Sequence, residues 1–334
     1  MSSTNEIGID DITPLPVDDA EKLTGRITDQ IRTAVIADSD FLELLLTSVL
    51  SRGHVHLEDV PGTGKTVAAQ VLAQALGVEF NRVQFTPDLL PADITGSHVY
   101  NENKKEFTFQ EGPIFANVVL ADEINRAPPK TQAALLEAMG EGQVSIEGTT
   151  YELPKPFFVI ATQNPIDQQG TFELPEAQRD RFAVKTSMGY PERSGEFELL
   201  ERRENRRKKI PTVSPVTDSK TLRQIQVTAE GITVSEEIKQ YIIDLARQTR
   251  THDDVKTGVS PRGIQKLFET ARGAAIVNGR DYVAPEDVKT LAKPVYSHRL
   301  VLTQEALVQD RDAESIIESV MGEVKVPGAT GKPV

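Results

Sequence analysis

The residues best suited to chemistry lie in one short glycine-rich segment, Pro61-Gly-Thr-Gly-Lys-Thr66. Glycines let backbone N–H groups close around phosphate oxygens, a lysine reaches the outer phosphates, and a threonine hydroxyl ligates Mg²⁺. A short strand is expected at residues 54–57 before the segment, and a helical pattern up to Leu76 follows it. The sequence therefore predicts that ATP or GTP is bound by Pro61, Gly62, Thr63, Gly64, Lys65 and Thr66. The usual first glycine of this pattern is Asp59 here.

Two adjacent carboxylates, Asp122 and Glu123, follow the apolar run Val118-Val-Leu-Ala121. Paired carboxylates at the end of a buried strand can divide two tasks, since one holds Mg²⁺ through water and the other orients or deprotonates the attacking water. From their order, Asp122 is assigned to the metal, together with Thr66, and Glu123 to the water. A solvated strand end is the alternative for such a pair on its own.

Three further polar residues are candidates for the same reaction. Asn164 closes the run that begins at Pro156, and is expected to sense the γ-phosphate and the water if its strand lies beside that of Asp122. A simple turn at Asn164-Pro165 is the alternative. Arg181 and Arg262 are candidate cations for the γ-phosphate and can be donated by a neighbouring subunit. Taken alone, each arginine fits a surface ion pair better than a catalytic role.

Alternating strands and helices must position these residues. The runs at residues 117–121 and 156–161 are continuously apolar, as in strands that are buried on both faces of a parallel sheet. With the helical pattern at residues 130–139, they predict a doubly wound α/β layer, which binds ligands at the carboxyl ends of its strands. Helical patterns fill residues 18–50 before this layer. Amphipathic helices are expected after it at residues 192–208, 235–250, 261–278 and 285–298, with one more after Arg311.

The composition of the chain excludes several classes of protein. The chain has 334 residues, 38% of them hydrophobic, a formal net charge of −13 and no cysteine. Disulfide frameworks and thiol chemistry are excluded, and nucleic acid is a secondary hypothesis because the acidic surface repels polyanions. Residues 1–19 are polar, and no apolar run is long enough for a membrane span, so we expect a cytoplasmic protein. The expected divisions are a disordered segment at 1–17, a nucleotide-binding αβα domain at 18–190, a helical domain at 191–310, and a helix and tail at 311–334.

Two weaker signals favour structural explanations. Six basic residues between Arg202 and Lys209 form a dense patch, but Glu204 interrupts it and no aromatic residue is interleaved, so a solvated helix is favoured over a nucleic-acid site. His54 and His56 share a face of one strand. Because no third ligand is near them, a packed pair is favoured over a metal site.

In their order along the chain, these residues resemble the AAA+ ATPases, and specifically the MoxR family. The resemblance covers roughly residues 20–300. The stretches that carry it are Leu57-Glu-Asp-Val-Pro-Gly-Thr-Gly-Lys-Thr66, Arg82-Val-Gln-Phe-Thr-Pro-Asp-Leu-Leu-Pro-Ala-Asp93, Ala121-Asp-Glu-Ile-Asn-Arg-Ala-Pro-Pro-Lys-Thr-Gln132, Ala161-Thr-Gln-Asn-Pro165 and Ser260-Pro-Arg262.

The resemblance implies an AAA+ P-loop αβα sandwich with a parallel sheet and a small all-α lid, and ATP hydrolysis with ATP and Mg²⁺ as cofactors. It implies that Lys65 and Thr66 belong to the Walker A motif, Asp122 and Glu123 to Walker B. Asn164 would be sensor 1, Arg262 sensor 2 from the lid, and Arg181 an arginine finger acting in trans, with Arg179 as its rival.

The resemblance also implies partners. These are a homo-oligomeric ring of six subunits and a protein client that the ring remodels, with a von Willebrand factor A (VWA) protein as a candidate on another chain. Residues 86–112 resemble this clade's insertion in the helix after the second strand. Residues 137–153 resemble its β-hairpin before sensor 1, with turns expected at Gly140, Gly142 and Gly148. Ordinary connecting loops are the alternative for both. The alternative functions are a nucleotide-gated binding module with little turnover, a nucleic-acid motor resembling MCM helicases, and a chelatase-like subunit for metal insertion.

Overall fold

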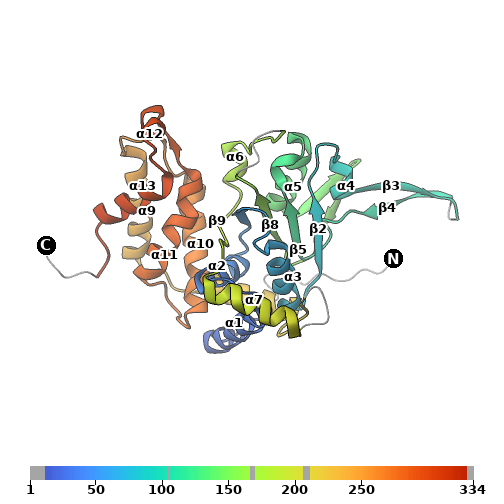
Figure 1. The fold of residues 1–334 in the computed structure, drawn as a ribbon, viewed down its shortest axis with the longest axis horizontal. Helices are drawn as coiled ribbons and strands as arrows, with labels where there is room; N and C mark the ends of the chain where they lie inside the picture. Colours follow the sequence, from blue (N-terminus) through green and yellow to red (C-terminus); the bar gives the residue numbers. More distant parts are fainter. Residues whose placement is uncertain (1–11, 104, 166–169, 206–210, 329–334) are drawn as a thin grey trace.

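The computed structural model describes residues 12–103, 105–165, 170–205 and 211–328 (Figure 1). A five-stranded sheet with the strand order β2-β5-β8-β1-β9 forms its centre, and all the pairings between these strands are parallel. Its strands are β1 (Val55–Glu58), β2 (Phe80–Gln84), β5 (Val118–Asp122), β8 (Phe158–Gln163) and β9 (Val184–Thr186). The expected α/β layer with a parallel sheet is confirmed.

Helices cover both faces of this sheet, and the central strands β5 and β8 each contribute to two cores. The covering helices are α1 (Val17–Arg32), α2 (Ser39–Leu50), α3 (Lys65–Leu76) and α5 (Pro129–Glu141). In β5, Val118 and Leu120 belong to the core that contains α1, α2 and α3, whereas Val119 and Ala121 belong to the core that contains α5. Because successive side chains of a strand point to opposite faces, a strand buried on both faces is apolar at every position.

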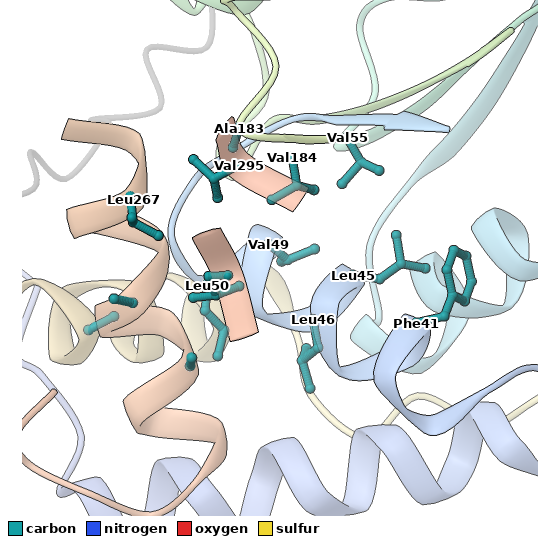
Figure 2. Close-up of a cluster of buried hydrophobic side chains, with 14 of the residues drawn as sticks. Phe41, Leu45, Leu46, Val49, Leu50, Val55, Ala183, Val184, Leu267 and Val295 are labelled. Atoms are coloured by element: carbon teal, nitrogen blue, oxygen red, sulfur yellow. The ribbon is translucent and has the colours of Figure 1, made fainter. Parts of the chain in front are cut away.

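The first of these cores continues into the C-terminal helices. Figure 2 shows Val49 of α2 and Val184 of β9 in one cluster with Leu267 of α10 (Pro261–Val277) and Val295 of α11 (Pro285–Tyr296). A buried hydrogen bond adds to this packing, because the Gln226 side-chain amide donates to the Val49 carbonyl oxygen at 2.7 Å. The C-terminal helices are therefore packed directly against the layer that holds the sheet.

The C-terminal region is helical, as expected. Besides α10 and α11 it contains α8 (Ser219–Glu230), α9 (Glu236–Thr251), the 3-10 turn η3 (Ser297–Arg299), α12 (Gln304–Val308), α13 (Ala313–Glu323) and a small antiparallel sheet of β10 (Val255–Thr257) and β11 (Val301–Leu302). Ser235 and Ser260 cap α9 and α10, since their hydroxyls accept the N–H groups of residues three positions later. These caps explain why both helices begin where the sequence predicts.

Two antiparallel hairpins interrupt the sheet layer. The first follows α4 (Pro91–Thr95) and pairs β3 (Gly96–Asn101) with β4 (Glu106–Glu111), projecting away from the body of the molecule (Figure 1). The second pairs β6 (Gln143–Ile146) with β7 (Thr149–Glu152), inside the segment expected to form a hairpin.

The glycines of the second insertion play different parts. Gly142 ends α5 with φ +65° and Gly148 has φ +84° between β6 and β7, both in the left-handed region that glycine adopts at little cost. The expected turn at Gly140 is wrong, because this residue lies inside α5. A Cβ there would lie 2.4 Å from Nη1 of Arg181, so Gly140 makes room for that side chain.

Three short or peripheral elements complete the description: η2 (Ile124–Arg126), α6 (Glu176–Arg179) and α7 (Arg193–Asn205). The expected helix at residues 192–208 corresponds to α7, and its last residues, with part of the basic patch, lie outside the described residues. So do residues 1–11 of the segment expected to be disordered and residues 329–334 of the tail. Within the described ranges, no helix combines the length and the apolar composition that crossing a membrane requires.

Candidate active site

The glycine-rich segment forms the loop between β1 and α3. Gly62 and Gly64 have φ values of +90° and +97°, which residues with a side chain rarely adopt. Gly64 is the N-cap of α3, so the free N–H groups and the positive dipole end of that helix face the loop. The Lys65 ammonium group donates to the carbonyl oxygens of Asp59 and Val60, at 2.8 and 2.9 Å. The loop therefore offers a concentrated set of donors to an anion, as the sequence predicts.

The carboxylate of Asp59 explains why the usual first glycine is absent. Its side chain is buried, and it accepts N–H groups from Val60 at 2.9 Å, from Met188 at 2.9 Å and from Gly189 at 3.1 Å. The departure from the common pattern thus ties the start of the loop to the chain that leaves β9.

Asp122 and Glu123 end β5 and are held by different neighbours. Oδ1 of Asp122 accepts the Thr162 hydroxyl at 2.6 Å, and Oδ2 accepts Nη2 and Nε of Arg82 at 2.6 and 3.1 Å. Thr66 and Asp122 supply the hard oxygen ligands that Mg²⁺ prefers. These residues fit a magnesium ion that is shared with nucleotide phosphates.

Glu123 has an unusual backbone conformation. Its φ of +57° lies in the left-handed region, and its N–H group donates to the hydroxyl oxygen of Thr162 at 2.9 Å. Its carboxylate accepts from Gln84 at 2.8 Å and lies 3.1 Å from Nε of Arg126. Backbone strain of this kind persists where surrounding contacts fix it, often at active sites.

One pocket of about 390 Å³ collects these groups. Its lining includes Lys65, Thr66, Asp122, Glu123 and Asn164. Asn164 reaches it because β8 lies directly beside β5, with Ala161 opposite Ala121. The structure therefore brings together the predicted loop, both carboxylates and Asn164 at the carboxyl edge of the sheet.

Arg82, Gln84 and Thr162 are site residues that the sequence interpretation misses. Arg82 and Thr162 line the pocket, and Gln84 holds Glu123. Arg82 and Gln84 are two positions apart on β2, so they share a face. This edge strand mixes polar and apolar residues and has no continuous apolar run, which is why it is not expected from the sequence.

The three arginines proposed as finger or sensor, Arg179, Arg181 and Arg262, do not line this pocket. Arg179 and Arg181 precede β9, so they lie at the amino edge of the parallel sheet, across from the pocket. At about 3.3 Å per residue, the central strands separate the two edges by roughly 15 to 20 Å. Nη1 of Arg181 donates to the Leu136 carbonyl oxygen of α5 at 2.6 Å. Nη1 of Arg262, at the start of α10, lies 3.9 Å from Asp180.

Both histidines of β1 are packed inside the protein. Nε2 of His54 lies 3.0 Å from the Met139 carbonyl oxygen, and Nδ1 accepts the Val159 N–H group at 3.0 Å. His56 stacks on Phe182. Burial lowers the pKa of each imidazole from 6.5 to about 4. These contacts confirm the packed pair favoured from the sequence. Separately, the described residues contain no cluster of three or more His, Cys, Asp or Glu that could hold a metal ion.

The comparisons with known proteins agree along most of the chain. Residues 54–184 match AAA_3, the ATPase family associated with various cellular activities (AAA), and residues 247–320 match the AAA lid domain. The chain is 44% identical over 310 residues to YeaC of Bacillus subtilis, covering 93% of this chain and 97% of that protein. It is 41% identical over 313 residues to Chaperone MoxR1 of Mycobacterium tuberculosis, covering 91% and 82%.

One more sequence relative and one solved structure are similar to most of the chain. Protein MoxR of Paracoccus denitrificans is 32% identical over 342 residues, which cover 93% of this chain and 96% of that protein. The crystal structure of an ATPase candidate from Cytophaga hutchinsonii superposes with a TM-score of 0.87 at 37% identity, covering 93% of this chain and 96% of that one. The matches extend well beyond the short motifs.

Proposed function

Because the chain belongs to the MoxR family of AAA+ ATPases and is an ATP hydrolase, we propose that it hydrolyses ATP with Mg²⁺ in the pocket at the carboxyl edge of the sheet and works as a ring that remodels a protein partner. The observation that carries this proposal is the convergence of the glycine loop, Asp122, Glu123 and Asn164 on one pocket. ATP is the proposed nucleotide.

The roles follow from the positions of the side chains. Lys65 and the loop N–H groups would bind the outer phosphates, and Thr66 and Asp122 would hold Mg²⁺, which neutralises charge on the phosphate oxygens when bound. Glu123 accepts a proton from water as the water oxygen bonds to the γ-phosphorus. The bond from that phosphorus to the bridging oxygen then breaks, and ADP leaves with the electron pair. The Asn164 amide orients the water.

A neighbouring subunit is proposed to complete each site. Arg181 and Arg262 lie at the edge of the sheet opposite their own pocket, so one subunit alone offers neither guanidinium to its γ-phosphate. In the proposed ring, the amino edge of one subunit would face the pocket of the next, and an arginine donated there would stabilise the charge of the transition state. Six subunits are proposed from the family resemblance. Arg262 would then act across the interface as Arg181 does.

A protein client is proposed because one similar protein is named a chaperone, and the projecting hairpin suits such a contact. Tyr100 and Phe107 face each other across β3 and β4 with ring centroids 5.4 Å apart, and are 51% and 69% exposed. Exposed aromatic residues on a protruding element are typical of binding surfaces. A VWA protein and a complex that receives a metal cofactor are the candidate clients, and the cytoplasm is the proposed location.

The rival functions have less support. A binding module that switches with little turnover has no need of Glu123, which is held at the pocket beside the metal ligand. A nucleic-acid motor conflicts with the net charge of −13.

Nucleotide binding and hydrolysis measured side by side test the assignment. Lys65→Ala should weaken binding of a fluorescent ATP analogue by at least about tenfold, because the loop then lacks its only lysine. Glu123→Gln should keep the affinity within about threefold and abolish turnover. Unchanged affinity in Lys65→Ala would show that the nucleotide binds elsewhere.

A further inference from the structure

A buried arginine of the helical lid holds the turn that carries Arg181. Arg299 ends η3, and its side chain is only 2% exposed. The turn comprises residues 179–183 and joins α6 to β9. Arginine guanidinium groups are almost never fully buried unless they are paired and hydrogen-bonded. The hydrogen-bond partners of Arg299 therefore identify the segments that this side chain holds in place.

Those contacts lie on both sides of Arg181. Nε of Arg299 donates to the Asp180 carboxylate at 2.8 Å, and Nη2 donates to the carbonyl oxygens of Asp180 and Phe182 at 3.3 and 2.5 Å. Nη1 donates to the Ala183 carbonyl oxygen at 3.2 Å. One guanidinium group thus binds the residue before Arg181 and the two residues after it, which fixes the backbone from which Arg181 projects.

The other side of the same guanidinium is fixed to the lid. Nη1 also donates to the Val295 carbonyl oxygen and lies 2.7 Å from Nε2 of His298. Burial and the adjacent Arg299 charge hold the pKa of His298 well below its usual range, so its ring is neutral beside the guanidinium group. Arg299 is therefore bonded to the lid and to the turn at the same time.

A second lid element binds the same carboxylate. At the start of α10, the Ser260 hydroxyl donates to Oδ2 of Asp180 at 3.3 Å, and Nη1 of Arg262 lies 3.9 Å from that oxygen. A Cβ on Gly263 would come within 2.9 Å of Cδ of Arg299, so the stem of Arg299 packs closely on the first turn of α10. Asp180, between the two candidate fingers, is held by residues from two lid elements.

We propose that Arg299 is a positioning residue that couples the lid of one subunit to its own arginine finger, so that the lid sets how well Arg181 serves the site of the neighbouring subunit. This inference rests on the proposed function, since it needs Arg181 to act in trans. Lysine at position 299 could still pair with Asp180, but it has one nitrogen and cannot bind the three carbonyl groups of the turn together. The position of the finger would then be lost while the charge remains.

Mixed rings separate this role from a purely structural one. An Arg181→Ala subunit has an intact pocket and no finger, and a Lys65→Ala subunit offers a finger and has no activity of its own. Mixing them should restore turnover in the Arg181→Ala pockets. With Lys65→Ala/Arg299→Lys as the donor, the restored rate should fall roughly tenfold to a hundredfold, as expected for a misplaced catalytic charge.

A matched pair elsewhere in the lid provides the control. Arg280 also forms an ion pair, with the buried Asp287 at 2.6 Å, and none of its hydrogen bonds goes to the turn. A Lys65→Ala/Arg280→Lys donor should restore turnover as well as Lys65→Ala does. In the reverse arrangement the Arg299→Lys change is moved to the recipient, Arg181→Ala/Arg299→Lys, and the donor is Lys65→Ala. The restored rate should then stay within about threefold of that of the Arg181→Ala recipient, because the donor that supplies the finger keeps its own Arg299.

Each possible outcome has a defined meaning, with ring assembly checked by sedimentation in every mixture. Full restoration by the Arg299→Lys donor, or equal losses as donor and as recipient, would overturn the positioning role. No restoration by Lys65→Ala itself would contradict the trans action of Arg181, and the inference with it. Asp180→Asn in the donor should act in the same direction as Arg299→Lys, which guards against a folding defect of one variant.

Discussion

The hydroxyl group of Thr162 lies 2.6 Å from Oδ1 of Asp122, to which it donates a buried hydrogen bond. The same oxygen of Thr162 accepts the N–H group of Glu123 at 2.9 Å. One side chain of β8 thus fixes the proposed metal ligand and the left-handed backbone of the proposed base.

This relationship predicts the effect of Thr162→Val, which keeps the shape and removes both hydrogen bonds. Turnover should fall roughly tenfold to a hundredfold, because both carboxylates lose their alignment. The affinity for ATP should stay within about threefold, since the loop is untouched. Thr162→Ser is the matched control and should retain most of the rate. Equal turnover in the valine and serine variants would contradict the positioning of the two carboxylates by Thr162.

Arg181→Ala should bind ATP as the unaltered protein does and hydrolyse it about a thousandfold more slowly, because an arginine finger acts on the transition state. Arg179→Ala should have the smaller effect on turnover. Steady-state turnover and nucleotide affinity of both variants measure this. A larger loss in Arg179→Ala would make Arg179 the finger, and weakened binding in Arg181→Ala would contradict its position away from its own pocket.

Phe107→Ser should leave stability almost unchanged, by less than about 0.5 kcal/mol, because the side chain is 69% exposed. Basal ATP turnover should also be unchanged. If the first hairpin contacts the client, a Glu123→Gln protein should retain a partner in pull-downs that Phe107→Ser/Glu123→Gln loses. Equal retention by both would remove the hairpin from client binding. Thr108→Ala, a surface change in the same hairpin, serves as the control.

Stability should fall as the pH drops from 7 toward 4. His54 and His56 have a pKa of about 4 in the folded protein and 6.5 when unfolded, so the unfolded chain binds more protons in this window. Their contribution is complete above pH 6.5 and is lost toward pH 4. At pH 5.5 each histidine should lower the free energy of unfolding by about 1.4 kcal/mol relative to its value well above pH 6.5.

Urea unfolding at pH 7.5 and 5.5 measures this loss, and His56→Gln should show a shallower pH dependence than the unaltered protein. The physical reason is that His56→Gln removes one of the two buried imidazoles that the unfolded chain protonates in this pH range and the folded chain does not. Identical slopes in the two proteins would contradict the buried, neutral state of His56.

The buried centre of the fold could be predicted from the sequence because its physical causes are local. In strands β5 and β8 the runs 118–121 and 158–161 are apolar at every position, since each face meets a different core. The polar residues at their ends could be placed together because parallel neighbours end at the same edge. Strand β2 could not be found this way, because it is an edge strand on which Arg82 and Gln84 serve the site.

What the sequence could not provide depends on distant contacts. Gly140 suits a turn by type, but the structure uses it inside α5 to admit Arg181. Asp59 departs from the glycine pattern because its partners, Met188 and Gly189, are about 130 positions away. Arg299 carries no local signal either, since its role depends on the turn that it contacts more than a hundred positions earlier.

ATP turnover per subunit, measured across protein concentrations that bracket ring assembly by sedimentation, tests the central claim most directly. The claim is that a neighbour completes each site. Turnover per subunit should therefore rise steeply as the ring assembles, and should vanish at every concentration in Glu123→Gln. Constant turnover per subunit from the monomer to the assembled protein would show that one subunit holds a complete site and would contradict the account.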